Sequence, residues 1–343
     1  MGGPIDFLYL SQEEVMAAGG LDMATIMDVV ESAFHAFAQG HARVPSKIVL
    51  DLPPGEKERG RINALAAYIG GNLEVAGIKW IPSFPRNPVE HGLPRANALI
   101  ILNNSQTGMP LAVMDGTILS AMRTGAVGGI GAKYLARRDS ETAALIGLGV
   151  QARTQALALK EVLPNLNEFR GWDPKKTALE AANDIMKLTG VRTTAVQTPK
   201  DAVVGADVIV TATVADEPIV KDAWVKEGTL FTHIGSYVEE EYDVVLHSNK
   251  IVVDDWEAVK HRKTPVLARM FKEGLVKDEG IYANLAEVVD GRKPGRENSR
   301  ERIFFAPIGM AHEDIAVAYK IYQEAKRKGI GQTLRLWTEP IWT

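Results

Sequence analysis

Two hydrophobic patterns follow one another along this chain and predict different folds. Between residues 143 and 256, apolar runs of strand length alternate with stretches whose apolar residues recur at helical spacing. Alternation of strand and helix is typical of a doubly wound, mostly parallel sheet, an α/β fold. The predicted strands are Ala143–Ile146, Asn167–Asp173, Val191–Val196, Ala206–Thr213, Gly228–Ser236 and Lys250–Trp256.

The preceding part of the chain has short strands broken by turn residues, without helices between them. This pattern predicts a largely antiparallel sheet. Its candidate strands are Lys47–Asp51, Arg61–Leu65, Val75–Trp80 and Ala98–Leu102. Amphipathic helices are predicted at Met23–Gln39 and at Glu313–Ala325, and the apolar spacing of the second suits packing back onto this first domain.

The turn after Ala143–Ile146 carries the most specific motif. Gly147, Gly149 and Ala152 fit G-x-G-x-x-A, in which the first glycine permits the bend, the second leaves room for pyrophosphate, and the third residue lets helix and strand pack. Asp173 ends the next strand, 24 residues after Gly149, close to the interval expected for a carboxylate that binds ribose. The alternative is a structural turn with a solvated aspartate. We expect a dinucleotide site on a Rossmann-type sheet.

The overall composition of the chain argues against several classes of function. The 343 residues are 46% hydrophobic and 24% charged, with a net charge of −4, so nothing favours binding to nucleic acid or to an anionic membrane. The absence of cysteine excludes disulfides and thiol chemistry, and the histidines show no ligand spacing, so no metal site is predicted. No signal peptide or membrane span is visible, which predicts a cytoplasmic protein.

Several motifs together resemble those of the ornithine cyclodeaminase/μ-crystallin family. They are Thr107-Gly-Met-Pro, Met114-Asp-Gly, Met122-Arg-Thr-Gly-Ala, Ile146-Gly-Leu-Gly-Val-Gln-Ala152 and Gly309-Met-Ala-His-Glu-Asp-Ile-Ala316. The resemblance implies a homodimer of two-domain subunits. Residues 1–125 and 305–343 would form a discontinuous α+β domain for substrate binding and dimerisation, and residues 126–304 the dinucleotide-binding domain.

The resemblance also implies roles for individual residues. By position, Arg123 matches the arginine that grips the substrate carboxylate and Lys79 the lysine of the pocket, while Lys47 and Arg61 match basic residues of an alanine-dehydrogenase branch. The predicted cofactor contacts are Thr124, Gly147, Gly149, Val150, Gln151, Ala152, Asp173, Thr211, Thr213, Val214 and Gly235. The last four lie at carboxyl-terminal strand ends, which face the ligand crevice in such sheets.

One departure from the family bears on the reaction. Cyclodeaminases have an aspartate after the fifth strand of the nucleotide domain, where this chain reads Ile234-Gly-Ser-Tyr237. Tyr237, a predicted substrate contact, cannot pair with a substrate ammonium as an aspartate would. The nearest carboxylates are Glu239, Glu240 and Glu241, any of which could take its place.

We therefore expect an NAD(P)-dependent oxidoreductase that acts on the CH–NH2 or C=N group of an amino acid, keto acid or imine. Lys79 lies between Ile78 and Trp80, and a partly desolvated lysine can transfer protons near neutral pH, with Lys47 assisting. Asp173 favours NAD, while Lys175 and Lys176 keep NADP as the alternative. A cyclodeaminase with tightly bound NAD and a non-catalytic binder of μ-crystallin type are the competing functions.

Overall fold

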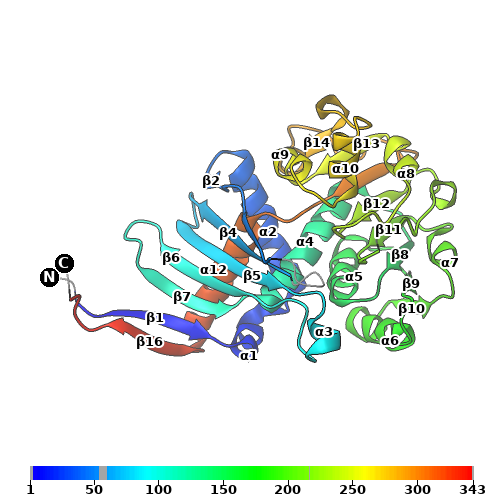
Figure 1. Ribbon diagram of the computed structural model, residues 1–343. Helices are drawn as coiled ribbons and strands as arrows, with labels where there is room; N and C mark the ends of the chain where they lie inside the picture. The colour runs from blue at the N-terminus through cyan, green and yellow to red at the C-terminus, as the bar shows by residue number, and fades with distance from the viewer. Residues whose placement is uncertain (1–2, 54–59, 216, 342–343) are drawn as a thin grey trace. The chain divides into compact units, whose positions relative to one another are not determined.

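The computed structural model describes residues 3–53, 60–215 and 217–341 and contains two compact units. Unit 1 comprises Met1–Arg123 and Met310–Thr343, and unit 2 comprises Thr124–Gly309 (Figure 1). The chain thus passes between units at residues 123/124 and 309/310, where the sequence predicts 125/126 and 304/305.

Unit 1 is built on an eight-stranded sheet in the order β16-β1-β7-β6-β5-β4-β2, with β3 also paired to β4. All neighbours run antiparallel except β1 and β7, so the expected largely antiparallel sheet is confirmed. The strands are β1 (Ile5–Leu10), β2 (Ala42–Arg43), β3 (Ile48–Asp51), β4 (Arg61–Ile69), β5 (Val75–Ser83), β6 (Leu99–Asn104), β7 (Pro110–Asp115) and β16 (Gln332–Trp337).

Helices α2 and α12 cover one face of this sheet (Figure 1). Side chains alternate across a strand, so Leu65, Lys79 and Ile100, paired in register on β4, β5 and β6, are buried on that covered face. Among the described residues, no helix is both long and apolar enough to cross a membrane. The helices of this unit are α1 (Gln12–Val15), α2 (Met23–Ala38), α3 (Asn87–Glu90), the first part of α4 (Thr117–Leu135) and α12 (Ala311–Lys328).

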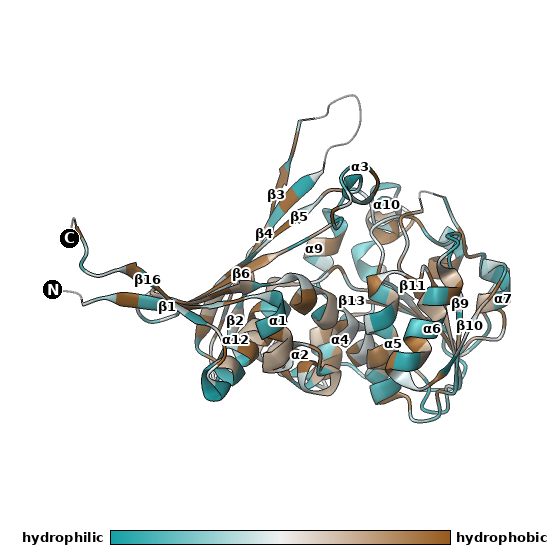
Figure 2. Ribbon diagram, turned by 90° about the horizontal axis from the view of Figure 1, so that it is seen from below, coloured by the Kyte–Doolittle hydropathy of each residue, from teal (hydrophilic) through white to brown (hydrophobic). Residues whose placement is uncertain are grey.

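The other face of the same sheet carries exposed apolar side chains. Ile48, Leu50, Trp80, Leu99 and Ile101 occupy the alternate positions of β3, β5 and β6 and are 38–70% exposed. The ladders pair Trp80 with Leu99 and Ile78 with Ile101, so these side chains lie next to one another across the strands. Figure 2 shows brown, hydrophobic stretches along the ribbons of β3 and β6. We call this surface the apolar sheet face.

Unit 2 has an eight-stranded parallel sheet in the order β10-β9-β8-β11-β12-β15-β13-β14, which confirms the Rossmann-type α/β prediction. Its strands are β8 (Thr142–Ile146), β9 (Glu168–Trp172), β10 (Arg192–Ala195), β11 (Val208–Thr211), β12 (Leu230–His233), β13 (Lys250–Val253), β14 (Ala283–Asn284) and β15 (Ile303–Ala306). Its helices are the rest of α4, α5 (Val150–Val162), α6 (Ala178–Thr189), α7 (Pro199–Val203), α8 (Tyr242–Leu246), α9 (Trp256–Lys260), α10 (Val266–Lys272) and α11 (Leu285–Val289).

The many charges and turns of residues 257–304 predict a peripheral segment. In the structure, however, the end of this segment lies in the middle of the sheet. β15 lies between β12 and β13, and its Ile303, Phe304 and Phe305 are fully buried. Four apolar residues after a charged stretch give too short a signal to separate a central strand from the start of the C-terminal region.

The small residues of α4 allow close packing inside unit 2. A Cβ at Gly125 would lie 2.6 Å from the carbonyl oxygen of Thr154 on α5, and positions 128 and 131 face Gln155 and Phe305 just as closely. Gln155 also donates from Nε2 to the Thr124 carbonyl oxygen at 2.9 Å. The glycines of α4 therefore serve its close approach to α5 and to β15 within unit 2.

Candidate active site

Lys79 is the central charged side chain of unit 1. It points from β5 toward α12 and is 1% exposed. Its Nζ donates to Asp314 Oδ2 at 2.6 Å and to Ser120 Oγ at 3.1 Å. Burial lowers the pKa of Lys79 to about 8, with Asp314 acting in the opposite direction and Arg123 in the same direction. A lysine in this state exchanges protons close to neutral pH.

Arg123, in α4, is buried beside Asp314 and a second carboxylate, Glu313. Its Nε donates to Asp314 Oδ1 at 3.0 Å, and its Nη1 donates to Glu313 Oε2 at 2.8 Å. Burial by itself would lower the pKa of Arg123, but Asp314 and Glu313 raise it, so the guanidinium stays charged. These bonds fix the plane of the guanidinium, and Nη2 donates to no other residue described in the structure.

Glu313 and Asp314 are functional candidates that the sequence prediction missed. Both lie in the first turn of α12 and are fully buried, and acidic residues are favoured there by the helix dipole. Glu313 also accepts from the Met310 backbone N–H at 3.1 Å, which caps the helix. The signal was present in Gly309-Met-Ala-His-Glu-Asp, but an acidic first turn is usually a solvated one.

His312, just before them, is buried between two phenylalanines. Its ring stacks on Phe37 and meets Phe34 edge-on, with centroids 5.2 Å apart in both cases. Burial lowers the pKa of His312 to about 3, and within the described part of the chain neither ring nitrogen has a hydrogen-bond partner. The imidazole is therefore neutral at physiological pH.

The four charges of this cluster cancel. Lys79 and Arg123 contribute two positive charges, and Asp314 and Glu313 contribute two negative ones. Buried charges are stable only when paired in this way. A ligand that carries a carboxylate and a protonated nitrogen, with no net charge, would keep the balance. We call these four residues the charge quartet.

The other two predicted basic residues lie near the quartet on the same sheet. Lys47 comes one residue before β3, where the ladder pairs Ile48 with Ala64, so it stands at the level of Leu65, the partner of Lys79. Arg61 begins β4, four residues from Leu65. Both side chains are partly buried.

In unit 2 the predicted dinucleotide turn joins β8 to α5. Gly147 has φ +90°, and a Cβ there would lie 2.8 Å from the Ala212 carbonyl oxygen, so only glycine fits. At Gly149 a Cβ would have no atom within 4 Å, which is the open space that a pyrophosphate needs against the backbone. The backbone N–H groups in the first turn of α5 point toward this glycine turn.

Asp173 stands beside this turn at the carboxyl end of β9. Its Oδ2 accepts from the Leu148 backbone N–H and its Oδ1 from that of Lys175, both at 2.9 Å. Each oxygen keeps a lone pair for a further donor. The carboxylate is thus fixed against the glycine turn, in the place where a ribose hydroxyl donor fits.

The remaining predicted cofactor residues gather at the same edge of the unit 2 sheet. Val150, Gln151 and Ala152 form the first turn of α5, and Thr124 lies in α4 against Gln155. Thr211 ends β11, followed by Thr213 and by Val214, which is 58% exposed, while Gly235 follows β12. The turn, the aspartate and these strand ends together fit a nicotinamide dinucleotide.

Comparison with known proteins identifies the family of this chain. The model of the ornithine cyclodeaminase/mu-crystallin family matches residues 7–329. The chain belongs to this family. It is 39% identical over 336 residues to an alanine dehydrogenase of Archaeoglobus fulgidus, covering 97% of this chain and 99% of that one.

Solved structures give the same result. One is the Delta(1)-pyrroline-2-carboxylate reductase of Thermococcus litoralis in complex with NADH and L-proline, with TM-score 0.89, 36% identity and coverage of 96% of this chain and 100% of that one. Another is an archaeal alanine dehydrogenase dimer with bound NAD, with TM-score 0.88, 37% identity and coverage of 97% and 100%. The predicted family is thus confirmed.

The loop after β12 carries Tyr237 where the cyclodeaminases have an aspartate. Tyr237 lies partly buried in the loop after β12. Glu239 and Glu240 are fully buried below it, and the Thr213 backbone N–H donates to Glu239. His233 Nδ1 lies 3.0 Å from Glu240 and 3.6 Å from Glu239. We call His233, Glu239 and Glu240 the carboxylate–imidazole cluster.

The ionisation of this cluster differs from that of the quartet. Burial by itself would lower the pKa of His233, but Glu240 and Glu239 raise it to about 9. Burial raises the pKa of Glu239, and His233 opposes that shift. The Glu239 carboxyl also lies against Gly235, where a Cβ would not fit. These groups hold the loops after β11 and β12 together.

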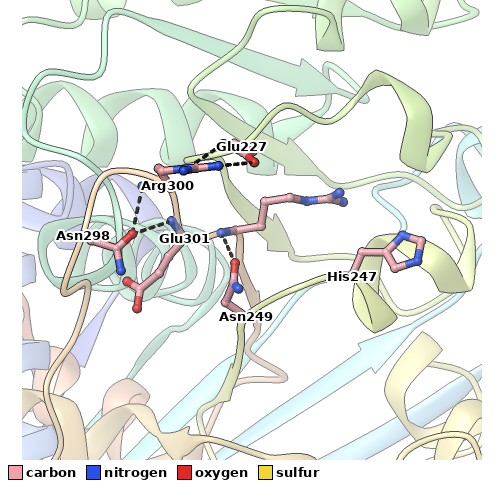
Figure 3. A pocket seen from close by; sticks show the side chains of 7 residues that line it. Glu227, His247, Asn249, Asn298, Arg300 and Glu301 are labelled. Atoms are coloured by element: carbon pink, nitrogen blue, oxygen red, sulfur yellow. Dashed lines mark hydrogen bonds and ion pairs between the residues drawn. The ribbon is translucent and has the colours of Figure 1, made fainter.

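A surface hollow of about 410 Å³ in unit 2 is separate from these groups (Figure 3). Residues 227, 249 and 302 line it, and each lies just before a strand, so the hollow is at the amino ends of β12, β13 and β15. Its cations are paired, Arg300 with Glu227 at 3.0 Å and Arg302 with Asp222 at 2.6 Å. Ligands of doubly wound sheets bind at the opposite ends of the strands.

Within the described ranges, no group of three or more histidine or acidic side chains is placed to hold a metal.

Proposed function

We propose that this family member interconverts an α-amino acid and the corresponding α-imino acid, with NAD as the redox partner and the charge quartet as the substrate site. The predicted class, an enzyme of amino-acid or imine oxidation and reduction, is confirmed by relatives that are an alanine dehydrogenase and a pyrroline-2-carboxylate reductase. The observation that carries the proposal is the buried pairing of Lys79 and Arg123 with Asp314 and Glu313.

Unit 1 supplies the binding and proton-transfer groups in this proposal. Arg123 presents Nη2 and the second N–H of Nη1 to the substrate carboxylate, a planar geometry that a lysine lacks. Lys79 moves the proton at the substrate nitrogen, because its lowered pKa lets it act as acid or base. Lys47, just before β3 on the far side of β4, assists, and Arg61 and Tyr237 complete the substrate contacts.

Unit 2 supplies the cofactor site. Gly149 and the first turn of α5 receive the pyrophosphate, and Asp173 accepts the ribose hydroxyls, which disfavours a 2′-phosphate and supports NAD over NADP. When bound, the nicotinamide accepts or gives the hydride at the substrate α-carbon. Thr124, Thr211, Thr213, Val214 and Gly235 line the rest of this site.

The carboxylate–imidazole cluster supports dehydrogenation or imine reduction over cyclodeamination. Glu239 could have replaced the missing aspartate, but it is fully buried and accepts from the Thr213 backbone N–H. Glu240 is paired with His233. Glu241 accepts from the Asp222 backbone N–H at 2.9 Å. All three candidate carboxylates thus have partners within unit 2, so none replaces the cyclodeaminase aspartate in this proposal.

The apolar sheet face supports a homodimer. Surfaces with several large exposed apolar side chains are typical of interfaces between subunits. We propose that two copies pair through Ile48, Leu50, Trp80, Leu99 and Ile101. Trp80→Glu would give a monomer by analytical ultracentrifugation, whereas an unchanged dimer would place the interface elsewhere.

A substrate screen tests the enzymatic proposal. NADH formation at 340 nm with L-amino acids, and NADH consumption with cyclic imines or with 2-oxo acids plus ammonia or alkylamines, should identify at least one active substrate. Release of ammonia from ornithine without net NADH production would instead show a cyclodeaminase. Tight NADH binding without turnover of any substrate would show a binding protein.

We also propose a cytoplasmic location, where free nicotinamide cofactor is available. Cell fractionation tests this location.

A further inference from the structure

We propose that Asp314 is a positioning residue that couples the proton-transfer group to the carboxylate clamp. The inference rests on the proposed function of Lys79 and Arg123. One carboxylate binds both side chains: Oδ2 accepts from Lys79 Nζ at 2.6 Å, and Oδ1 accepts from Arg123 Nε at 3.0 Å. The distance between the two functional cations is therefore set by a single side chain.

The position of Asp314 in the fold suits this role. It is fully buried in the first turn of α12, a helix of 18 residues that packs on β4 and β5. Lys79 comes from β5 and Arg123 from α4, so Asp314 joins three elements that are distant in sequence. A rigid helix fixes a functional group more firmly than a loop does.

Asp314 also determines how Lys79 ionises. The charged groups that face the lysine are Asp314 and Glu313 from α12 and Arg123 from α4, and the neutral Ser120 hydroxyl accepts its remaining described bond. Asp314 favours the ammonium form, whereas burial and Arg123 disfavour it. Without the Asp314 charge, the pKa of Lys79 would fall further below its ordinary value.

Glu313 provides the matched comparison. It binds Arg123 through Nη1 at 2.8 Å, and it has no described hydrogen bond to Lys79. Its effect on the lysine is the weakest of those named above. If Asp314 couples the two cations, the two carboxylates should have separable effects: Asp314 on proton transfer and Glu313 mainly on carboxylate binding.

The test compares pH profiles of kcat for the wild-type protein, Asp314→Asn and Glu313→Gln. In imine reduction Lys79 must be protonated, so activity falls above its pKa; in amino-acid oxidation it must be deprotonated, so activity falls below it. Asp314→Asn should move both limbs to lower pH by about 1–3 units, the range for loss of one close charge. Glu313→Gln should raise KM and move the limbs by less than about 0.5 unit.

A second readout does not depend on turnover. The ¹⁵N resonance of Lys79 Nζ, identified by its loss in Lys79→Met, should titrate near pH 8 in the wild-type protein and lower in Asp314→Asn. Equal limbs and equal titration in the wild-type and Asp314→Asn proteins would overturn the inference while leaving the proposed function intact. A wild-type protein that turns over no substrate would overturn the proposed function itself.

Asp314→Asn leaves two buried cations short of one partner, so the variant can fail to fold. In that case the pair is removed together, and Lys79→Gln/Asp314→Asn is compared with Lys79→Gln. The inference expects the double variant to bind the amino acid at least about tenfold more weakly than Lys79→Gln does, because Arg123 Nε has lost its charged partner. Binding is measured by the quenching of NADH fluorescence. Equal dissociation constants of these two variants would contradict the inference. In the same Lys79→Gln background, Asp314→Glu keeps the negative charge and should bind the amino acid more tightly than Asp314→Asn.

Discussion

The two units treat buried charge in opposite ways. In unit 1 the charge quartet joins two cations to two carboxylates, and every charge has a partner within 3.0 Å. In unit 2 the carboxylate–imidazole cluster has two carboxylates and one imidazole, so full ionisation would leave a net negative charge in the interior. The first arrangement balances its charges and can accept a zwitterion, while in the second burial raises the pKa of Glu239.

This difference indicates a division of labour. The quartet keeps a lysine whose pKa is about 8 in contact with an arginine clamp, which suits proton transfer to a bound ligand. The cluster raises the pKa of His233 to about 9, above the range in which an imidazole exchanges protons at neutral pH, and its contacts are to loop backbone and to each other. We therefore expect the quartet to govern turnover and the cluster to govern stability.

The largest expected effect is that of Lys79→Met. Removing the proton-transfer group should lower kcat by about 10²–10⁴-fold, measured at saturating substrate and cofactor. NADH binding should be unchanged, because the residues proposed to bind the cofactor lie in unit 2. A variant that keeps near-normal turnover would show that the quartet only binds substrate.

The next effect concerns His233→Asn and stability. Because the folded-state pKa of His233 lies above its ordinary value, the imidazolium stabilises the fold fully below about pH 6.5, and this contribution is lost as pH rises through about 9. At pH 6.5 the variant should be less stable than the wild-type protein by about 3 kcal/mol, since a buried carboxylate loses its partner.

The pH dependence separates this prediction from a general packing defect. The difference in melting temperature between the wild-type protein and His233→Asn should shrink from pH 6.5 to pH 9, and kcat of the folded variant should stay within about tenfold of wild type. A constant difference, or loss of turnover in a stable variant, would contradict the structural role of the cluster.

A smaller effect is expected at the cofactor carboxylate. Asp173→Asn keeps the shape but removes the charge that repels a 2′-phosphate, so the preference of kcat/KM for NADH over NADPH should fall by about tenfold. A wild-type protein that already prefers NADPH would refute the role of Asp173, and Lys175 and Lys176 would then be the residues to change.

Lys47→Met should have the smallest effect. Lys47 is only partly buried and is separated from Lys79 by β4, so its loss should lower kcat by about threefold without moving the pH limb set by Lys79. A decrease as large as that of Lys79→Met would exchange the roles of the two lysines.

The residues proposed for the cofactor could be named from the sequence because they are nearly contiguous. Gly147, Gly149 and Ala152 lie within six positions, and Asp173 follows one helix and one strand later, so local spacing carries the information. Lys79 could be singled out for a similar reason, since its apolar neighbours indicate burial. The cyclodeaminase alternative depended on where three glutamates point, which spacing does not reveal.

The sequence by itself determined the alternation of elements, the glycine turn, the family and the identity of the two cations. Only the tertiary structure decided which carboxylates neutralise them: Asp314 is 235 positions from Lys79 and 191 from Arg123, and reaches them because α12 returns to the sheet of unit 1. It likewise placed β15 inside the unit 2 sheet and paired β16 with β1. The physical reason is that periodicity records whether a residue is buried, while the partner of a buried charge depends on which distant element packs against it.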